Sequence, residues 1–218
     1  MALLLLILAV SYLLGSIPFG YLLVRIFRGE DVRQSGSGNI GATNVGRKSP
    51  ALGVLTLVLD ALKGTAAVWL ASQILARSVH ASIDFAHYPD LSLAALFAVL
   101  GHMFPIWLRF RGGKGVATSL GAFAPLAPLG ILAALGVFLA VTFVSRYVSL
   151  GSITAAASFP FIAWGWFRQQ YPNPLRRVLP IAVASVFIIL KHHQNIGRLV
   201  KGTENRLNSK QARNQGNQ

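Results

Sequence analysis

Long apolar runs, separated by short basic segments, constrain this chain more than any other feature. The first run, 2–24, is nearly all apolar and is long enough to cross a bilayer, which takes about 20 helical residues. Further runs cover 51–76, 91–108, 116–127, 129–144, 150–167 and 178–190. Only 12% of the residues are charged, against about 25% in soluble domains. This pattern predicts an all-α polytopic membrane protein.

The first and the last run each allow two interpretations. A cleaved signal peptide is the alternative for 2–24, but no basic residue precedes Arg25 and no clean cleavage site follows, so a spanning helix is favoured. The last run, 178–190, makes about 20 Å of helix and falls short of the ~30 Å hydrocarbon core. We expect this helix to continue into the polar segment after it or to stay partly buried in protein.

The distribution of basic residues sets the expected orientation. A net charge of +14 would indicate nucleic-acid binding in a soluble protein, but here Lys and Arg lie between apolar runs, so no nucleic-acid partner is expected. Seven crossings with the N-terminus outside put 15 of the 20 basic residues in the cytoplasm and 4 outside, whereas treating 116–144 as one crossing gives 11 against 8. We expect seven transmembrane helices, some short or broken, and a cytoplasmic C-terminus. They form one domain, 1–208, followed by a disordered polar tail, 209–218.

The chemistry is expected in four polar segments, all cytoplasmic in this topology. The first, 35–47, reads SGSGNIGATNVGR. Its glycines let the backbone approach a ligand, successive N–H groups can form an anion-binding nest, and Arg47 offers a fork suited to phosphate. A flexible linker is the alternative. The candidate ligand-binding residues of this segment are Ser35, Ser37, Gly38, Asn39, Gly41, Thr43, Asn44 and Arg47.

The second polar segment, 109–118, places Lys114 in a Gly-Gly-Lys-Gly turn that opens an apolar run. Unpaired N–H groups at a helix start and the Lys114 ammonium can converge on one anion. Arg109 and Arg111 are interpreted as positive-inside anchors. His102 lies about two turns earlier and can reach the turn, with a structural hydrogen bond as its alternative role. The candidate binding residues here are His102, Gly112, Gly113, Lys114, Gly115 and Thr118.

The third polar segment, 146–152, supplies two hydroxyl groups. Ser149 and Ser152 lie where the apolar run at 150 begins. A helix N-cap is the alternative role for either serine.

The fourth polar segment, 191–204, combines basic, amide and imidazole groups. On a helix, Lys191, Asn195 and Arg198 fall on one face, with His192 beside Asn195. This face could present two cations, an amide and an imidazole to one ligand. A basic interface helix that extends its side chains to the membrane surface is the alternative. Glu204 is the only carboxylate near this motif.

The remaining polar residues give weaker indications. Asp60 and Lys63 lie within an apolar run at i and i+3, and we expect them to form a structural ion pair. His80 and Asp84 form too small a set for a metal site. No carboxylate cluster accompanies the anion loops, so no metal and no cofactor is expected. The absence of cysteine excludes disulfides and thiol nucleophiles.

Six stretches of the chain together resemble one family of bacterial enzymes. They read SYLLGSIPFGYL, DALKG, SGSGNIGATNVGR, GHMFPIWLRFRGGKGVAT, RYVSLGSI and HHQNIGRLVKGTEN. In this order they are similar to the acylphosphate:glycerol-3-phosphate acyltransferases, and the resemblance extends to about Asn205. It implies a seven-span bacterial inner-membrane enzyme with a cytoplasmic active site. The implied reaction passes a fatty acyl group from acyl phosphate to glycerol 3-phosphate, giving lysophosphatidic acid and phosphate in the first acylation step of phospholipid biosynthesis.

The residues agree with this reaction, because donor and acceptor each carry a phosphate and the chain has two glycine-rich anion loops. The partners implied are these two substrates and membrane lipids. Acyltransferases that use soluble donors carry a His-x4-Asp pair, which no histidine here forms. Acyl phosphate is already activated, so the resemblance is also compatible with proton transfer assisted by the substrate.

The resemblance and the motifs together assign roles to individual residues. Lys114 and Arg47 neutralise phosphate, Ser35 orients the substrates, and His192 and Asn195 hold the glycerol moiety with its attacking hydroxyl; these five are the catalytic candidates. The substrate-binding candidates are Ser37, Gly38, Asn39, Gly41, Thr43, Asn44, His102, Gly112, Gly113, Gly115, Thr118, Ser149, Ser152, Arg198 and Glu204.

Two other classes of protein remain as alternatives at this stage. A transporter of phosphorylated metabolites or lipids would use the same anion loops, but it would need a polar path across the membrane, and the polar motifs cluster on one side. A non-catalytic membrane subunit would bind anionic headgroups through its basic face. Activity of the purified chain with acyl phosphate and glycerol 3-phosphate distinguishes the three.

Overall fold

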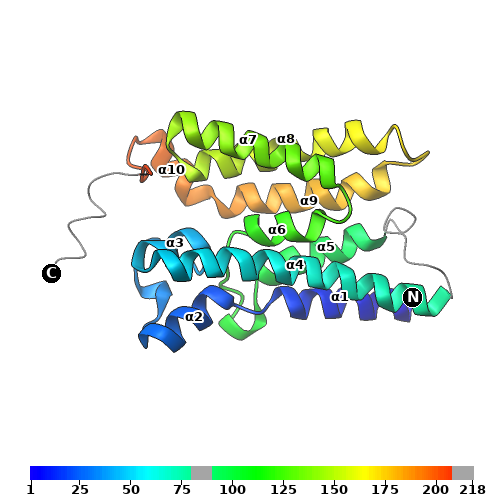
Figure 1. Ribbon diagram of the computed structural model, residues 1–218, viewed down its shortest axis with the longest axis horizontal. Helices are drawn as coiled ribbons and strands as arrows, with labels where there is room; N and C mark the ends of the chain where they lie inside the picture. The colour runs from blue at the N-terminus through cyan, green and yellow to red at the C-terminus, as the bar shows by residue number, and fades with distance from the viewer. Residues whose placement is uncertain (80–89, 208–218) are drawn as a thin grey trace.

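The computed structural model describes residues 1–79 and 90–207, and all regular secondary structure in this part of the chain is helical (Figure 1). The helices are α1 (Ala2–Gly15), α2 (Phe19–Arg28), η1 (Val32–Gln34), α3 (Ala42–Lys48), α4 (Pro50–Val79), α5 (Asp90–Met103), η2 (Ile106–Leu108), α6 (Val116–Phe123), α7 (Pro128–Ser145), α8 (Val148–Phe167), α9 (Leu175–Lys191) and α10 (His193–Val200). His80, Asp84 and the tail 209–218 lie outside the described residues.

The helices form two halves with a shared middle. In Figure 1, α1, α2 and α4 lie on one side and α7, α8 and α9 on the other, with α5 and α6 between them. The packing agrees with this view, because α4 contacts α6, α1 and α9 both contact α5, and α8 contacts both α7 and α9. The middle of the molecule is therefore shielded on both sides by other helices.

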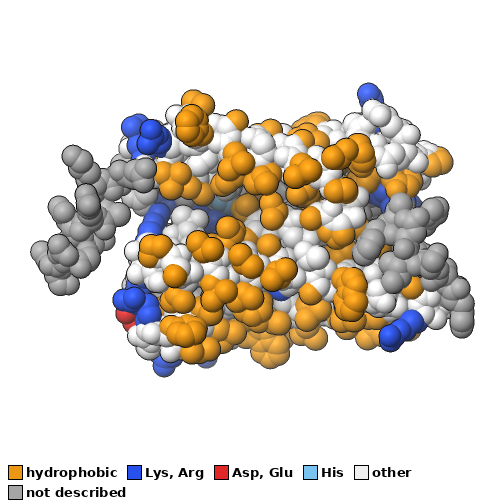
Figure 2. All heavy atoms as spheres, in the orientation of Figure 1, with side chains coloured by type: hydrophobic (Ala, Val, Ile, Leu, Met, Phe, Trp, Pro, Cys, Tyr) orange, Lys and Arg blue, Asp and Glu red, His pale blue; other side chains and the backbone are white. Residues whose placement is uncertain are grey.

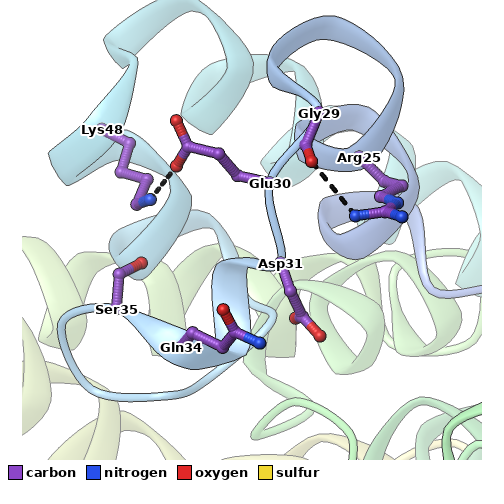
Figure 3. Close-up of a pocket in the computed structure, with 7 residues that line it drawn as sticks. All are labelled: Arg25, Gly29, Glu30, Asp31, Gln34, Ser35 and Lys48. Carbon is purple, nitrogen blue, oxygen red and sulfur yellow. Dashed lines mark hydrogen bonds and ion pairs between the residues drawn. The ribbon is translucent and has the colours of Figure 1, made fainter.

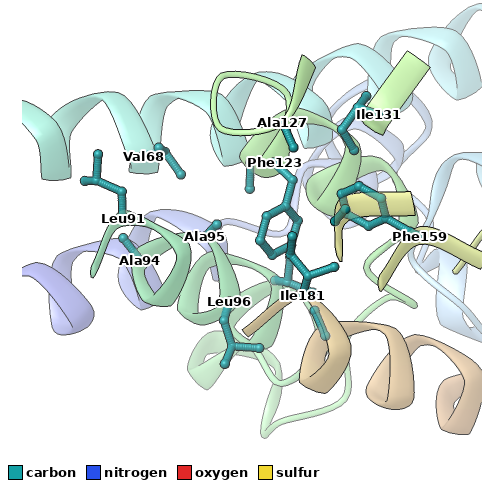
Figure 4. Close-up of a cluster of buried hydrophobic side chains, with 14 of the residues drawn as sticks. Val68, Leu91, Ala94, Ala95, Leu96, Phe123, Ala127, Ile131, Phe159 and Ile181 are labelled. Carbon is teal, nitrogen blue, oxygen red and sulfur yellow. The ribbon is translucent and has the colours of Figure 1, made fainter. Parts of the chain in front are cut away.

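The apolar core is built around Phe123 at the end of α6. Its ring meets that of Phe159 on α8 edge to face, with centroids 5.7 Å apart. Val68, Leu91 and Ile181 bring α4, α5 and α9 to the same cluster (Figure 4). The core thus joins the two halves through α6.

Glycines allow α4 and α6 to approach at backbone distance. A Cβ atom added to Gly121 would lie 1.9 Å from the carbonyl oxygen of Ala61, and one added to Gly64 would lie 2.3 Å from that of Thr118. Small residues at helix contacts are typical of membrane proteins, where close van der Waals packing replaces the hydrophobic effect. No larger side chain fits between these two helices.

Within residues 1–79 and 90–207, five helical segments are long and apolar enough to cross a membrane: 2–28, 50–78, 90–108, 128–145 and 148–167. The apolar runs at 116–127 and 178–190 form shorter helices. The eight residues of α6 make about 12 Å of helix, and the seventeen of α9 make about 25 Å. The run at 178–190 gains length by starting earlier, at Leu175, and not by continuing into the polar segment after it.

The flanks of the molecule carry the apolar side chains that a bilayer would cover. Phe143 is 84% exposed and Phe161 is 79% exposed. Figure 2 shows apolar side chains along the flank and basic ones gathered at the two ends. This surface belongs to an integral membrane protein, since soluble proteins rarely expose contiguous apolar surface of this extent.

The four polar segments meet at one end of the molecule, and the N-terminus lies at the other (Figure 1). Lys114, just before α6, donates a hydrogen bond to Asn195 on α10. Arg146, just after α7, accepts one from the N–H of Leu207 at 2.8 Å. The chain therefore leaves this end through α6 and returns through α7, and 116–144 is not one continuous helix.

One local prediction from the sequence is wrong. The helix expected to carry Lys191, Asn195 and Arg198 on a single face is broken, because α9 ends at Lys191 and α10 begins at His193. Lys191 instead lies over the ring of Phe104, with Nζ 4.2 Å from the ring centroid. The break turns α10 across the polar end, which separates Lys191 from the other two residues.

Candidate active site

The first glycine-rich loop is organised around the side chain of Asn44. Its amide nitrogen donates to the carbonyl groups of Val32, Ser35 and Asn39 at 2.8–3.1 Å, and its oxygen accepts from the N–H of Ser37 at 2.9 Å. The residue is 4% exposed. All its hydrogen-bonding groups are used by the loop, so Asn44 shapes the loop and is not free to bind a ligand.

Glycines give this loop its tight course. Gly36 and Gly38 have φ values of +59° and +68°, a conformation that favours glycine. A Cβ at Gly36 would also lie 2.3 Å from the side-chain oxygen of Asn44. Asn39 accepts a hydrogen bond of 2.8 Å from the N–H of Gly41, which leads into α3. This network shows an ordered loop and not a flexible linker, while the predicted binding of an anion by the loop stays a prediction.

The second glycine-rich turn rests on the end of α5. The N–H of Gly113 donates to the carbonyl of His102 at 3.0 Å, and that of Gly112 donates to Met103 at 3.2 Å. Gly115, with φ +86°, then starts α6. These contacts point Lys114 away from α5 toward α10.

A hydrogen-bonded network around Glu204 joins the last three polar segments. Glu204 accepts from Ser149 at 2.9 Å, from the Asn195 amide at 2.6 Å and from Arg198 at 2.6 Å. The oxygen of Asn195 accepts from the Lys114 ammonium. Four helix ends and loops are thereby fixed around one carboxylate, which is 9% exposed.

The charges in this network are set by opposing effects. Burial lowers the pKa of Lys114 to about 8; the negative charge of Glu204 opposes this, and Arg198 and Arg47 add to it. Burial would raise the pKa of Glu204, but the hydrogen bonds from Asn195, Arg198 and Ser149 outweigh it and lower the pKa below its ordinary value. Lys114 is thus a cation close to its titration point, beside a firmly ionised carboxylate.

His192 is a neutral imidazole at the break between α9 and α10. Burial lowers its pKa to about 4, and the charge of Lys114 contributes to this. Nδ1 lies 2.8 Å from the carbonyl oxygen of Ile188. Because a carbonyl only accepts, Nδ1 carries the proton, and Nε2 keeps a lone pair that can accept a hydrogen bond.

A cavity of about 560 Å³ lies between the two glycine-rich loops and the end of α9. Its lining includes Gly38, Gly112 and three basic side chains, Arg33, Arg111 and Lys191. Asp31 lines it as well and pairs with Arg33 at 2.6 Å, which leaves Arg111 and Lys191 as the basic groups of this lining that no carboxylate of the described residues pairs with. The sequence pattern indicated no ligand-binding role for Arg33 or Arg111, whereas Lys191 was expected on a ligand-facing helix side together with Asn195 and Arg198. Arg111 was interpreted as an anchor, although its place in the Gly-Gly-Lys-Gly segment was a signal for binding.

A second cavity, of about 420 Å³, lies beside α2 and α3 and is less suited to an anion. Glu30 and Asp31 contribute carboxylates to it, and Lys48 pairs with Glu30 (Figure 3). Arg25 donates to the carbonyl of Gly29 at 3.1 Å. Ser35 is the predicted site residue that lines this cavity.

Several predicted residues lie apart from the Glu204 network. His102 is buried beside Asp60, and Thr118 is fully buried on α6, where its hydroxyl has no hydrogen-bond partner among the residues that the structure describes. Ser152 donates back to Val148 within α8 at 2.9 Å, as a helical serine commonly does. Thr43 and Arg47 are exposed on α3, with Arg47 near enough to Lys114 to affect its pKa.

The fold and this polar end define a helical integral membrane protein with a basic, hydroxyl-bearing site at one end of its bundle. A family model described as glycerol-3-phosphate acyltransferase matches residues 5–202. The chain belongs to the glycerol-3-phosphate acyltransferase family.

Individual relatives agree with this membership. Proteins named glycerol-3-phosphate acyltransferase from Trichlorobacter lovleyi and Desulforamulus reducens are 48% and 44% identical to the chain. The alignments cover 90% and 92% of this chain and 93% of each relative. The crystal structure of PlsY (YgiH), an integral membrane glycerol 3-phosphate acyltransferase in its glycerol 3-phosphate form, matches with a TM-score of 0.80 and 38% identity, over 94% of this chain and 95% of that one.

Proposed function

We propose that this protein transfers a fatty acyl group from acyl phosphate to glycerol 3-phosphate, giving lysophosphatidic acid and phosphate. The relatives named glycerol-3-phosphate acyltransferase support the acceptor and the reaction class. Matching structures of PlsY have a glycerol 3-phosphate form and a lysophosphatidic acid form, which are an acceptor and its acylated product. No metal and no cofactor takes part in the proposed reaction.

The observation that carries the proposal is the network around Glu204, together with the neighbouring basic cavity. The network places Lys114 at the junction of α6 and α10, and the turn that holds Lys114 also lines the cavity through Gly112. Two phosphate-bearing substrates need two regions of positive charge close together. Lys114 with Arg47 supplies one, and Arg111 with Lys191 supplies the other.

In the proposed reaction, a hydroxyl oxygen of glycerol 3-phosphate attacks the carbonyl carbon of acyl phosphate. The new ester C–O bond forms, and the bond between the carbonyl carbon and the phosphate oxygen breaks. Lys114 stabilises the negative charge that develops on the departing phosphate. Nε2 of His192 accepts the hydrogen bond of the attacking hydroxyl, whose proton leaves to the departing phosphate or to this nitrogen.

The remaining predicted residues take supporting roles in the proposal. Ser35 and Ser37 offer hydroxyls from the first loop, and Ser149 acts through Glu204. The proposed binding groups are Gly38, Asn39, Gly41, Thr43, Gly112, Gly113, Gly115 and Arg198. The sequence also assigned Asn44, His102, Thr118 and Ser152 to binding, but these four are buried within the loops and helices and take a structural role in the proposal. Among these, Asn44 and His102 act by shaping the loops, since their side chains are buried against them.

We further propose that the protein crosses the bacterial inner membrane seven times, with an outer N-terminus and a cytoplasmic active site. The five long spans, together with α6 and α9, make up the seven crossings. The charge distribution supports the orientation, because most basic residues gather at the end that carries the site. Residues 1–208 act as one domain, and 209–218 is a dispensable polar tail.

The test is direct assay of the purified full chain in detergent with acyl phosphate and glycerol 3-phosphate. Formation of lysophosphatidic acid and phosphate in equal amounts is the expected result. Replacing acyl phosphate by acyl-CoA should give no product. A chain that binds glycerol 3-phosphate but forms no product with either donor would refute the proposal.

A further inference from the structure

An ion pair is buried in the middle of the bundle, away from the Glu204 network. Asp60 and Lys63 lie on α4, with side chains 2% and 3% exposed and with Nζ 2.8 Å from Oδ1. The pair expected from the sequence is thereby confirmed. Burying two charges inside a membrane protein costs free energy that apolar residues would avoid, so such pairs are functional candidates. The proposed reaction gives neither residue a role.

His102 connects this ion pair to the turn that holds Lys114. On one edge of its ring, Nδ1 lies 3.5 Å from Oδ1 of Asp60. On the opposite edge, Nε2 lies so close to Gly113 that a Cβ there would be 1.9 Å away. The His102 carbonyl also accepts the hydrogen bond from the N–H of Gly113. The ring is therefore a spacer between Asp60 and the residue before Lys114.

Lys63 extends the cluster toward the first glycine-rich loop. Its ammonium donates a 2.6 Å hydrogen bond to the carbonyl of Ile17, in the break between α1 and α2. Three residues later, Gly20 packs directly on the loop, since a Cβ there would lie 2.0 Å from the carbonyl oxygen of Ile40. One buried cluster thus contacts the supports of both glycine-rich loops.

We propose that Asp60, Lys63 and His102 form a positioning cluster that holds the Gly112–Gly113–Lys114 turn against the end of α5 and sets the place of the Lys114 ammonium. These residues touch no substrate. The inference rests on the proposed function for its kinetic consequence, but the geometry of the turn can also be measured without turnover.

The first test removes both charges together, so that no unpaired charge stays buried. Asp60→Asn/Lys63→Gln should insert and fold, because losing both members of a buried pair costs far less than losing one. We expect kcat to fall roughly 10- to 100-fold, the range that a displacement of about 1 Å can cause, while KM for each substrate changes much less. Ser72→Ala is the matched control, because Ser72 lies on the same helix, is 2% exposed and donates its hydroxyl to the Trp69 carbonyl of that helix.

The second readout reports on Lys114 itself. Amine-selective labelling as a function of pH, followed by mass spectrometry, gives the pH at which half of the Lys114 amine is deprotonated in the full chain. The parent should titrate near its pKa of about 8, and the double variant nearer the ordinary ~10.4 of lysine, because the turn no longer holds the amine in its buried position. An unchanged midpoint overturns the cluster whatever the activity. A parent-like kcat in the double variant of an active enzyme also overturns it, whereas an inactive parent refutes only the proposed function.

A double-mutant cycle keeps the inference testable if that variant fails to fold. Gly113→Ala should displace the turn, because the new Cβ meets the His102 ring. In a His102→Ala background the space is free, so the added loss from Gly113→Ala should be several-fold smaller. If Gly113→Ala lowers kcat by the same factor with and without the His102 ring, the ring does not hold the turn.

Discussion

Ser149 on α8 and Glu204, 55 positions later, are joined by a buried hydrogen bond of 2.9 Å that fixes the segment after α10 to the bundle. The same carboxylate holds Asn195 and Arg198. A side chain that orients its neighbours in this way has its effect on the reaction through them, since Asn195 in turn accepts from Lys114.

Replacing Glu204 by glutamine should therefore damage catalysis more than folding. The amide keeps the shape of the side chain but presents an N–H₂ group toward donors, so at least one of the three hydrogen bonds is lost. We expect kcat to fall roughly 10- to 100-fold through misplacement of Asn195 and Lys114. Glu30→Gln is the control, since this carboxylate is 41% exposed and its ion-pair partners among the described residues are Arg28 and Lys48. Equal activity of the two variants would contradict the positioning role.

Lys114→Ala should insert normally and lose most activity. Removing one group that stabilises transition-state charge typically costs ~10²–10³-fold in kcat. Arg109→Ala should keep most activity, because Arg109 is exposed and lies outside the basic cavity. Arg111 was interpreted from the sequence as a membrane anchor, but it lines the basic cavity. We therefore expect Arg111→Ala to raise KM for a phosphate-bearing substrate. Near-normal kcat and KM in Lys114→Ala would refute the catalytic assignment.

The sequence predicted which polar segments lie close together, but it did not predict which side chains support the loops and which are free to bind substrate. The convergence of Lys114, Asn195 and Glu204 follows from topology, because loops on one side of a membrane share a limited area. By contrast, the buried position of His102 depends on a ring fitting between Asp60 and Gly113, which no periodicity encodes. The hydrogen-bonding role of Asn44 likewise depends on the loop conformation.

Helix lengths show the same limit of sequence reasoning. Hydropathy identified the run 116–127 but could not tell that α6 is enclosed by other helices and need not match the bilayer thickness. The break at His192 was also missed, because its polar neighbours suit a helix equally well. The structure shows the break between Lys191 and His193, where the His192 ring bonds to the carbonyl of Ile188.

The rate should fall on the alkaline side of the pH profile near the pKa of Lys114, about 8. Lys114 acts as a cation, so raising the pH through this value removes the charge, and kcat/KM should fall about tenfold per pH unit beyond it. Lys114→Arg keeps its charge at any accessible pH, so whatever activity it retains should lack this decline. Initial rates corrected for spontaneous hydrolysis of acyl phosphate provide the measurement. A flat profile to pH 10 would contradict the role of the ammonium.

The proposed orientation can be tested with single cysteines, because the chain has none of its own. Lys201→Cys lies beyond α10 at the polar end, and Gln170→Cys lies between α8 and α9 at the other end; both positions are exposed. In intact cells stripped of their outer membrane, an impermeant thiol reagent should label Gln170→Cys and leave Lys201→Cys unmodified until the membrane is opened. The reverse pattern would place the site on the outer face and would refute the topology.

The close packing of α4 on α6 should make the protein's stability sensitive to a larger side chain between these two helices. Gly121→Ala should destabilise the protein by about 1–3 kcal/mol, the usual cost of overpacking, because the added Cβ would lie 1.9 Å from the carbonyl oxygen of Ala61. Gly136→Ala is the matched control on α7, where nothing lies within 4 Å of the added atom. There the substitution should be neutral or stabilising, because alanine favours the helix over glycine by about 1 kcal/mol. Thermal unfolding of both variants in the same detergent measures the difference in their stability. Because Lys114 lies just before α6, a shift of α6 should also lower kcat in Gly121→Ala. A variant as stable and active as Gly136→Ala would show that the two helices are not held at backbone contact.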